Sequence, residues 1–207
     1  MTNKWEEIRT KIAADPAMKP LVEQIEFPMP TEGRDPYFDL VRTIVFQQLS
    51  TKAAQTIFNR FLELFDDKWP HPDRLTRLDM EPMRRAGLSR QKATYVQNVA
   101  AFFLEEKLLS YDWAAQEDEA ILHLLTRIKG VGNWTAEMIL MFTLNRPDVF
   151  PVDDLGIQTA LAKLYALPTD LKEKKKRMIE IAEAWRPYRT FGSKYLWRYL
   201  DLGLWKP

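Results

Sequence analysis

The sequence predicts an all-α protein. Apolar residues recur at the three- and four-residue spacing of an amphipathic helix along most of the 207 residues. Ser, Thr or Asp precedes several of these stretches, where a side-chain oxygen can cap a helix. Prolines and glycines gather between the stretches, and no segment has the strict apolar–polar alternation of a strand. We find no internal repeat or low-complexity segment.

The first half of the chain predicts six helices. Residues 2–15 place Trp5, Ile8 and Ile12 on one helical face, and prolines are expected to keep Pro16–Pro36 mostly irregular. Ser50 or Thr51 can cap the helix that follows the 37–50 stretch, and Ser89 can cap a long helix after a turn at Gly87. The helices expected here are 2–15, 37–50, 52–65, 74–80, 81–86 and 90–106.

The second half predicts a helical hairpin, an extended loop and three more helices. The hairpin helices are expected at 117–128 and 133–145, with Lys129–Gly132 between them. Two prolines keep Arg146–Val152 extended, because proline cannot continue a helix. The remaining helices are expected at 154–165, 170–185 and 188–202.

The composition is typical of a soluble globular protein and excludes several chemistries. Hydrophobic residues make up 46% and charged residues 29% of the chain. The lack of cysteine excludes disulfides, thiolate zinc sites, iron–sulfur clusters and cysteine nucleophiles, and only His71 and His123 are available for histidine chemistry. Because no signal pattern or membrane-length apolar run occurs, we expect a cytoplasmic protein with no membrane partner, acting at the nucleoid if it is prokaryotic.

Charge is unevenly distributed, although the net charge is only +1. Acidic residues outnumber basic ones up to Leu40, and basic residues dominate from Lys172 to Arg198. One basic side on a near-neutral protein suits a polyanion partner. A solvated helix face explains the same pattern, and charge alone does not decide between them.

Two glycines in the stretch Leu125–Phe142 raise the main functional question. Each glycine in a helix interior lowers the stability of the helix by roughly 1 kcal/mol relative to alanine. Gly130 and Gly132 nevertheless stand only one residue apart. In a Lys-Gly-Val-Gly turn the glycines would allow positive φ, and the turn would present backbone N–H groups and Lys129 to an anion such as a DNA phosphate. The alternative is an ordinary tight turn between helices.

Four motifs in order resemble the helix-hairpin-helix DNA glycosylase superfamily, in particular its alkylation-repair branch, the 3-methyladenine DNA glycosylase II type. They are IVFQQLSTKAAQTIFNRF, GLSRQKATYV, IKGVGNWTA and RPDVFPVDDLGIQ. The resemblance runs from about Tyr37 to Trp205 and implies two helical lobes with a central cleft. Lobe A is expected at about 37–126, lobe B at about 1–36 plus 127–207, and the hairpin at 117–144. The N-terminal sheet domain of some members is not expected.

The resemblance assigns the chemistry to an acid after the proline loop. Asp154 is the implied catalytic carboxylate, which would stabilise the positive charge that develops on the sugar as the N-glycosidic bond breaks. Asp153 would be a cap or supporting residue, and an Asp pair at this position can also be only a helix cap. Bifunctional members carry a nucleophilic lysine where this chain has Trp134. A monofunctional enzyme without lyase activity is therefore implied.

The resemblance also implies a pocket for a flipped base and contacts to duplex DNA. Aromatic walls can hold a cationic alkylated purine by stacking and cation–π attraction, although core packing also explains most tryptophans. Met138 stands where relatives carry an aromatic residue, and Gln47 and Gln48 are either base contacts or solvated. The implied pocket residues are Trp134, Trp197, Gln47, Gln48 and Met138. The implied DNA contacts are Lys129, Gly130, Val131, Gly132 and Thr135 in the hairpin, with Leu88, Ser89 or Arg90 as the wedge that fills the gap.

No cofactor is expected beyond a monovalent cation, Na⁺ or K⁺, at the hairpin. The backbone carbonyls of Thr126, Ile128 and Val131 match the family positions for it. The expected partner is duplex DNA containing alkylated bases, bound by a monomer. Three other hypotheses remain: a glycosylase of this fold for oxidised or deaminated bases, a non-catalytic DNA-binding module, and a helical scaffold without a nucleic-acid role.

Overall fold

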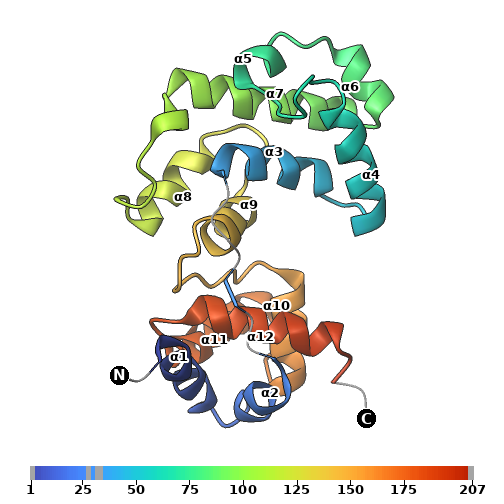
Figure 1. The fold of residues 1–207 in the computed structure, drawn as a ribbon. Coiled ribbons are helices and arrows are strands. Elements are labelled where there is room, and N and C mark those ends of the chain that lie inside the picture. The colour runs from blue at the N-terminus through green and yellow to red at the C-terminus, as the bar shows by residue number, and fades with distance from the viewer. Residues whose placement is uncertain (1–2, 27–28, 31–34, 205–207) are drawn as a thin grey trace. The chain divides into compact units, whose positions relative to one another are not determined.

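The computed structural model describes residues 3–26, 29–30 and 35–204, and all regular structure in these ranges is helical (Figure 1). The all-α prediction is confirmed. The helices are α1 (Lys4–Ala13), α2 (Lys19–Gln24), α3 (Pro36–Phe46), α4 (Thr51–Leu62), α5 (Pro72–Leu75), α6 (Met80–Ala86), α7 (Arg90–Glu105), the 3-10 turn η1 (Leu108–Ser110), α8 (Asp118–Thr126), α9 (Asn133–Met138), the π-turn η2 (Ile139–Thr143), α10 (Leu155–Leu164), α11 (Leu171–Glu183) and α12 (Arg189–Asp201).

Contacts divide the chain into two compact units. Unit 1 combines Met1–Thr31 with Asn145–Pro207, and unit 2 is Glu32–Leu144. The hairpin helices α8 and α9 thus group with unit 2, whereas the sequence analysis expected residues 127–144 in the other lobe. The reason is packing: Thr143, at the end of the hairpin, donates a hydrogen bond to Asp39 of α3 (Oγ1–Oδ2, 2.7 Å), and both residues are buried.

Unit 2 is built around α3 and α7, which pack against each other. Tyr37, Phe61 and Phe103 belong to its core, and Tyr37 and Phe103 lie with ring centroids 5.3 Å apart. Burial raises the pKa of the Tyr37 phenol, whose hydroxyl donates to the carbonyl of Pro70. This core anchors the hairpin and the turn after α3 in one unit.

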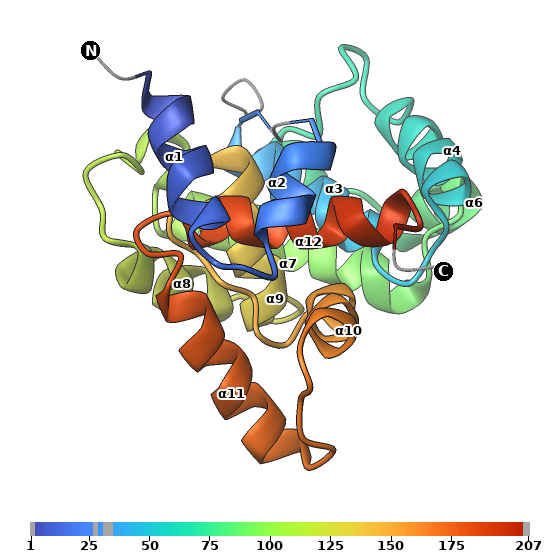
Figure 2. The same cartoon turned by 90° about the horizontal axis from the view of Figure 1, so that it is seen from below.

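Unit 1 is built around α12, which lies among α1, α2, α10 and α11 (Figure 2). Trp185 and Tyr195 are fully buried, and Asp15 links the N-terminal segment to this core. Its Oδ2 accepts hydrogen bonds from the Trp185 indole (3.0 Å) and from the Tyr165 hydroxyl (2.6 Å). The N-terminal helices are therefore part of the same body as the C-terminal ones.

Two local differences from the sequence analysis have clear causes. The segment Pro16–Pro36, of which residues 27–28 and 31–34 lie outside the described ranges, contains α2, because Pro20 stands in the first turn, where a helix tolerates proline. The helix expected over 37–50 ends at Phe46, because Gln47 turns out of the helical conformation with a ψ of 133°, and Gln48 follows at a φ of 56°. Within the described ranges we find no helix of the length and apolarity that a membrane crossing requires.

Candidate functional site

The hairpin turn of unit 2 uses its two glycines differently. Gly130 has a φ of 109°, and a Cβ there would lie 2.3 Å from the Tyr95 ring, so both the backbone and the packing require glycine. Gly132 has an ordinary φ of −94°, and no heavy atom lies within 4 Å of the position of a Cβ. The expectation of positive φ is confirmed for Gly130 and wrong for Gly132. Gly132 instead leaves open space beside the backbone at the start of α9.

The exposed part of the hairpin is smaller than expected. Lys129 is exposed, and its carbonyl accepts a hydrogen bond from the Asn98 side chain (3.0 Å), which fixes the backbone beneath it. Val131 is only 5% exposed and its N–H donates to the Ile128 carbonyl, so its side chain cannot reach DNA. Thr135 is 3% exposed, with its hydroxyl turned toward Gln47. With both side chains buried, the DNA contacts expected at Val131 and Thr135 are limited to their backbone atoms.

The carbonyl positions expected to hold a monovalent cation lie around the end of α8. The Thr126 hydroxyl donates to the carbonyls of Leu122 (2.8 Å) and His123 (3.1 Å), which holds the last turn of the helix. The Ile128 carbonyl accepts from Val131 N–H at 2.9 Å and keeps a second lone pair. Among the described residues, no group of three or more His, Asp or Glu side chains could hold a metal ion.

The two glutamines after α3 have different surroundings. Gln47 is half-buried, and its Nε2 donates to Thr135 Oγ1 at 3.4 Å, which joins this turn to the hairpin helix α9. Gln48 is exposed in a left-handed backbone conformation. Leu49, which the sequence analysis did not single out, is 40% exposed. Its signal was an apolar residue next to a polar pair at a helix end.

The turn between α6 and α7 corrects one wedge candidate. Leu88 is 3% exposed and packs inside unit 2, so it cannot enter a duplex. Ser89 is exposed and caps α7, accepting a hydrogen bond from Lys92 N–H (3.1 Å), and Arg90 is also exposed. Ser89 and Arg90 are therefore the residues of this turn that a ligand can contact.

Helix α9 carries a partly exposed indole near its start. Trp134 is 38% exposed, and it occupies the second position of the helix. Met138, one turn later, is half-buried. An exposed indole at the start of a helix suits stacking against a base.

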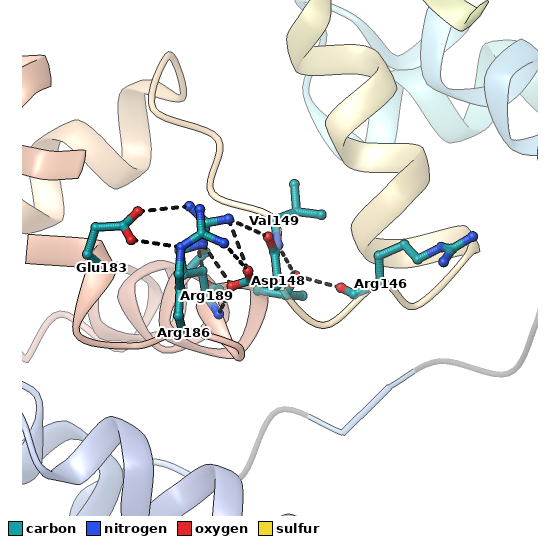
Figure 3. A network of polar contacts seen from close by, with 8 residues as sticks. Arg146, Asp148, Val149, Glu183, Arg186 and Arg189 are labelled. Carbon is teal, nitrogen blue, oxygen red and sulfur yellow. Dashed lines mark hydrogen bonds and ion pairs between the residues drawn. The ribbon is translucent and has the colours of Figure 1, made fainter. Parts of the chain in front are cut away.

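The loop that leads to the candidate acid is fastened to the start of α12 by a polar network (Figure 3). Asp148 receives the Arg189 guanidinium on both carboxylate oxygens (2.8 and 3.1 Å), and Arg186 adds a contact of 2.6 Å. Glu183 pairs with both arginines. Thr190 completes the network: its hydroxyl donates to the Arg146 carbonyl (2.6 Å) and accepts from Val149 N–H (3.0 Å).

Asp154 lies at the other end of this loop and caps α10. Its Oδ1 accepts hydrogen bonds from Ile157 N–H (2.8 Å) and from the Trp197 indole (2.9 Å). The expected neighbours Asp154 and Trp197 are thus brought together, with α12 supplying the tryptophan. Asp154 itself is the cap, and Asp153 pairs with Lys175 (2.5 Å). Of the two roles expected for Asp153, cap or supporting residue, the first is therefore taken by Asp154.

Gly156 makes the close approach of acid and tryptophan possible. A Cβ at this position would lie 3.0 Å from Asp154 Oδ1 and 3.0 Å from Trp197 Cδ1. Leu155, between the acid and this glycine, is 78% exposed. The sequence analysis did not identify Gly156, because a single glycine in the first turn of a helix has no pattern of its own.

Known proteins share the sequence and the fold. DNA-3-methyladenine glycosylase 1 of Schizosaccharomyces pombe is 36% identical over 169 residues, which are 81% of this chain and 73% of the relative. The solved DNA-3-methyladenine glycosidase of Bacillus halodurans matches with a TM-score of 0.82 and 35% identity, covering 97% of this chain and 91% of that one. The S. pombe 3-methyladenine DNA glycosylase in complex with abasic DNA matches with a TM-score of 0.78 and 32% identity, covering 94% and 97%.

The family match covers both candidate regions. Residues 41–187 match the description "HhH-GPD superfamily base excision DNA repair protein", a range that contains the turn after α3, the hairpin and Asp154. The chain therefore belongs to the HhH-GPD superfamily of base excision DNA repair proteins.

Proposed function

We propose that this protein is a monofunctional DNA glycosylase that excises alkylated purines, such as 3-methyladenine and 7-methylguanine, from duplex DNA. The observation that carries the proposal is the pair of Asp154 and Trp197, a carboxylate oriented at a helix start by an indole 2.9 Å away. The names of the relatives, DNA-3-methyladenine glycosylase and glycosidase, support the choice of substrate class. The proposed reaction is hydrolysis of the N-glycosidic bond, the first step of base excision repair.

In the proposed mechanism Asp154 acts on the sugar. As the base leaves, positive charge develops on the sugar ring, and a fixed carboxylate stabilises it and can orient the attacking water. The hydrogen bonds from Ile157 N–H and the Trp197 indole hold Oδ1 in place, so the carboxylate needs no reorganisation during the reaction. With Trp134 at the position of the family's nucleophilic lysine, water and not the protein attacks the sugar carbon as the base leaves, so an abasic site remains in an intact strand.

Substrate binding is assigned to aromatic side chains and to the hairpin. Alkylated purines carry a positive charge, which indole faces attract by about 1–2 kcal/mol when water is excluded. Trp197 and the exposed Trp134 are the proposed aromatic contacts. Lys129 and the open backbone beside Gly132 are the proposed phosphate contacts. A wedge requires an exposed apolar or long side chain, so Arg90 is kept as a candidate, Leu49 is added and the buried Leu88 is dropped.

Three further features belong to the proposal. A monovalent cation would be held by the carbonyl oxygens of Thr126, Ile128 and Val131. Its positive charge would attract a DNA phosphate to the hairpin. The protein would act as a monomer, because its duplex substrate needs no second copy. It would act in the cytoplasm, at the nucleoid in a prokaryote.

The test is base release from methylated duplex DNA by the native protein and by Asp154→Asn. Asparagine can still cap α10 and accept the Trp197 hydrogen bond, so the fold is retained while the charge is lost. We expect free methylated purines from the native protein, nicks only after alkali, and a rate at least about a hundredfold lower for Asp154→Asn.

The matched control is Asp153→Asn, which removes a neighbouring carboxylate that pairs with Lys175. Its release rate should stay near that of the native protein. Equal rates for Asp154→Asn and the native protein would remove the catalytic role of Asp154. DNA binding without any base release by the native protein would favour a non-catalytic module.

A further inference from the structure

Lys92 makes an unusual contact between two turns of unit 2. Its Nζ donates hydrogen bonds to the carbonyls of Val45 (2.7 Å) and Gln47 (2.6 Å), at the end of α3. The last carbonyls of a helix have no partner within the helix and carry the negative end of its dipole. An ammonium group placed there satisfies two of them. The Lys92 side chain is partly buried where it reaches these two carbonyls, and this burial lowers the pKa of its amine.

The position of Lys92 is itself fixed. The residue lies in the first turn of α7, and its backbone N–H donates to the capping hydroxyl of Ser89 (3.1 Å). The turn before the cap contains Gly87, with a φ of 110°, and the buried Leu88. Lys92 therefore connects a rigid point of α7 to the end of α3.

The segment that Lys92 holds carries the side chains available to a nucleotide. Gln47 reaches Thr135 beside Trp134, Gln48 is exposed at a φ of 56°, and Leu49 is 40% exposed. A residue other than glycine at positive φ costs free energy and persists only where its surroundings hold it. Among the described contacts, the two hydrogen bonds from Lys92 fix the carbonyls of Val45 and of Gln47, which directly precedes Gln48.

We propose that Lys92 is a positioning residue for base capture: it holds the Gln47–Leu49 turn in the conformation that engages the displaced nucleotide and its gap. The inference rests on the proposed glycosylase function. It goes beyond that function by assigning a role to a lysine that does not itself touch DNA. Without the ammonium group, the turn loses the donors for Val45 and Gln47 and samples other conformations.

The test compares Lys92→Met with Lys107→Met and Lys92→Arg. Lys107 is exposed and follows the far end of α7, which lies about 20 Å from Lys92 along the helix, so its substitution removes the same charge from the same unit. Lys92→Arg keeps a cation and several donors. The readouts are the single-turnover rate of base release at saturating protein, the fluorescence of 2-aminopurine beside the lesion, and amide hydrogen exchange of residues 47–50.

We expect Lys92→Met to lower the saturated rate and the flipping signal by about tenfold, with little change in affinity for duplex DNA. Exchange at residues 47–50 should rise while exchange in α8 and α9 stays unchanged. Lys107→Met should match the native protein, and Lys92→Arg should recover most of the lost rate. A merely structural role would lower the unfolding midpoint without this split between saturated rate and affinity.

Two results would overturn the inference. One is an unchanged exchange pattern at residues 47–50 in Lys92→Met, which would refute the positioning contact whatever the enzyme's substrate. The other is faster exchange with an unaltered rate and flipping signal, which would separate the contact from base capture. If the native protein releases no methylated base but the exchange still rises, the glycosylase proposal fails, and with it the capture role, while the contact itself stands.

Discussion

At the scale of single residues, the two hairpin glycines differ in what a side chain would meet. At Gly130 an added methyl group meets both a left-handed backbone and the Tyr95 ring, whereas at Gly132 it meets open space. Stability therefore depends on the first glycine. The second leaves room for a backbone of another molecule to approach, which is the role proposed for it at a DNA phosphate.

This difference predicts opposite outcomes for two alanine substitutions. Gly130→Ala should lower the free energy of unfolding by about 2–4 kcal/mol, from the left-handed conformation and from displacement of Tyr95. Gly132→Ala should cost less than about 1 kcal/mol as a poorer helix cap, yet weaken binding to duplex DNA. Urea unfolding and fluorescence-anisotropy titrations measure the two effects. Equal destabilisation by both, or unaltered DNA affinity in Gly132→Ala, would contradict this assignment.

Residue-scale function was only partly predictable from sequence. Asp154 and Trp197 were predicted by resemblance, and their hydrogen bond joins positions 43 residues apart. Leu88 was misassigned and Leu49 overlooked, because exposure depends on how a turn packs and not on the residue type. Gly156 was missed for a similar reason: its importance arises from a tryptophan on another helix.

At the scale of elements, the proline loop depends on the start of α12. Arg189 is 16% exposed and Asp148 20%, so their ion pair is shielded from water, and Arg186 and Glu183 extend it. The same helix presents Trp197 to Asp154. The loop is thus fastened to α12 near its beginning by ion pairs and near its end by the acid itself.

We call the ion pairs of Asp148 with Arg186 and Arg189 the loop clamp. We expect it to contribute more to the free energy of unfolding than an exposed ion pair does. Asp148→Asn should lower the free energy of unfolding by about 2 kcal/mol, because it leaves two arginines with a weakened partner. Arg177→Ala, which removes an exposed pair with Glu180 on α11, should cost less than about 1 kcal/mol. Urea unfolding of both variants, with Arg189→Met to complete a double-mutant cycle, provides the measurement. A coupling energy near zero between Asp148 and Arg189 would show that their ion pair does not stabilise the fold.

Elements were the most predictable level of the structure. Helical spacing and capping residues place most helices correctly, because these signals are local to each segment. The exceptions include α2, which tolerates Pro20 in its first turn, and the early end of α3 at Phe46. The helix expected at 74–80 is the shorter α5, Pro72–Leu75. At the end of α9, Leu144 N–H donates to the Ile139 carbonyl and forms a π-turn. Buried contacts with other helices determine such irregular turns, and a single sequence does not record them.

At the scale of the whole molecule, each unit holds a tyrosine hydroxyl in a specific hydrogen bond, buried at Tyr37 and partly buried at Tyr165. Tyr37 donates to the Pro70 carbonyl in unit 2, and Tyr165 donates to Asp15 in unit 1. Burial raises the pKa of both phenols, and the neighbouring Asp15 carboxylate raises that of Tyr165 further. Only the neutral phenol can donate these bonds, so both units depend on its remaining protonated.

The stability of the protein should therefore fall in alkaline solution. The folded-state pKa of each phenol lies above the unfolded value of about 10, so the stabilisation is fully present below that pH and is lost as the pH rises beyond it. Tyr37→Phe should cost about 1 kcal/mol at neutral pH through the lost hydrogen bond, but its stability should decline less steeply at high pH, because one phenol no longer has to ionise. Urea unfolding between about pH 8 and 11 gives the slopes, with Tyr165→Phe as the matched variant in the other unit. If the free energy of unfolding of both variants falls as steeply with pH as that of the native protein, the ionisation of these phenols does not cause the alkaline loss of stability.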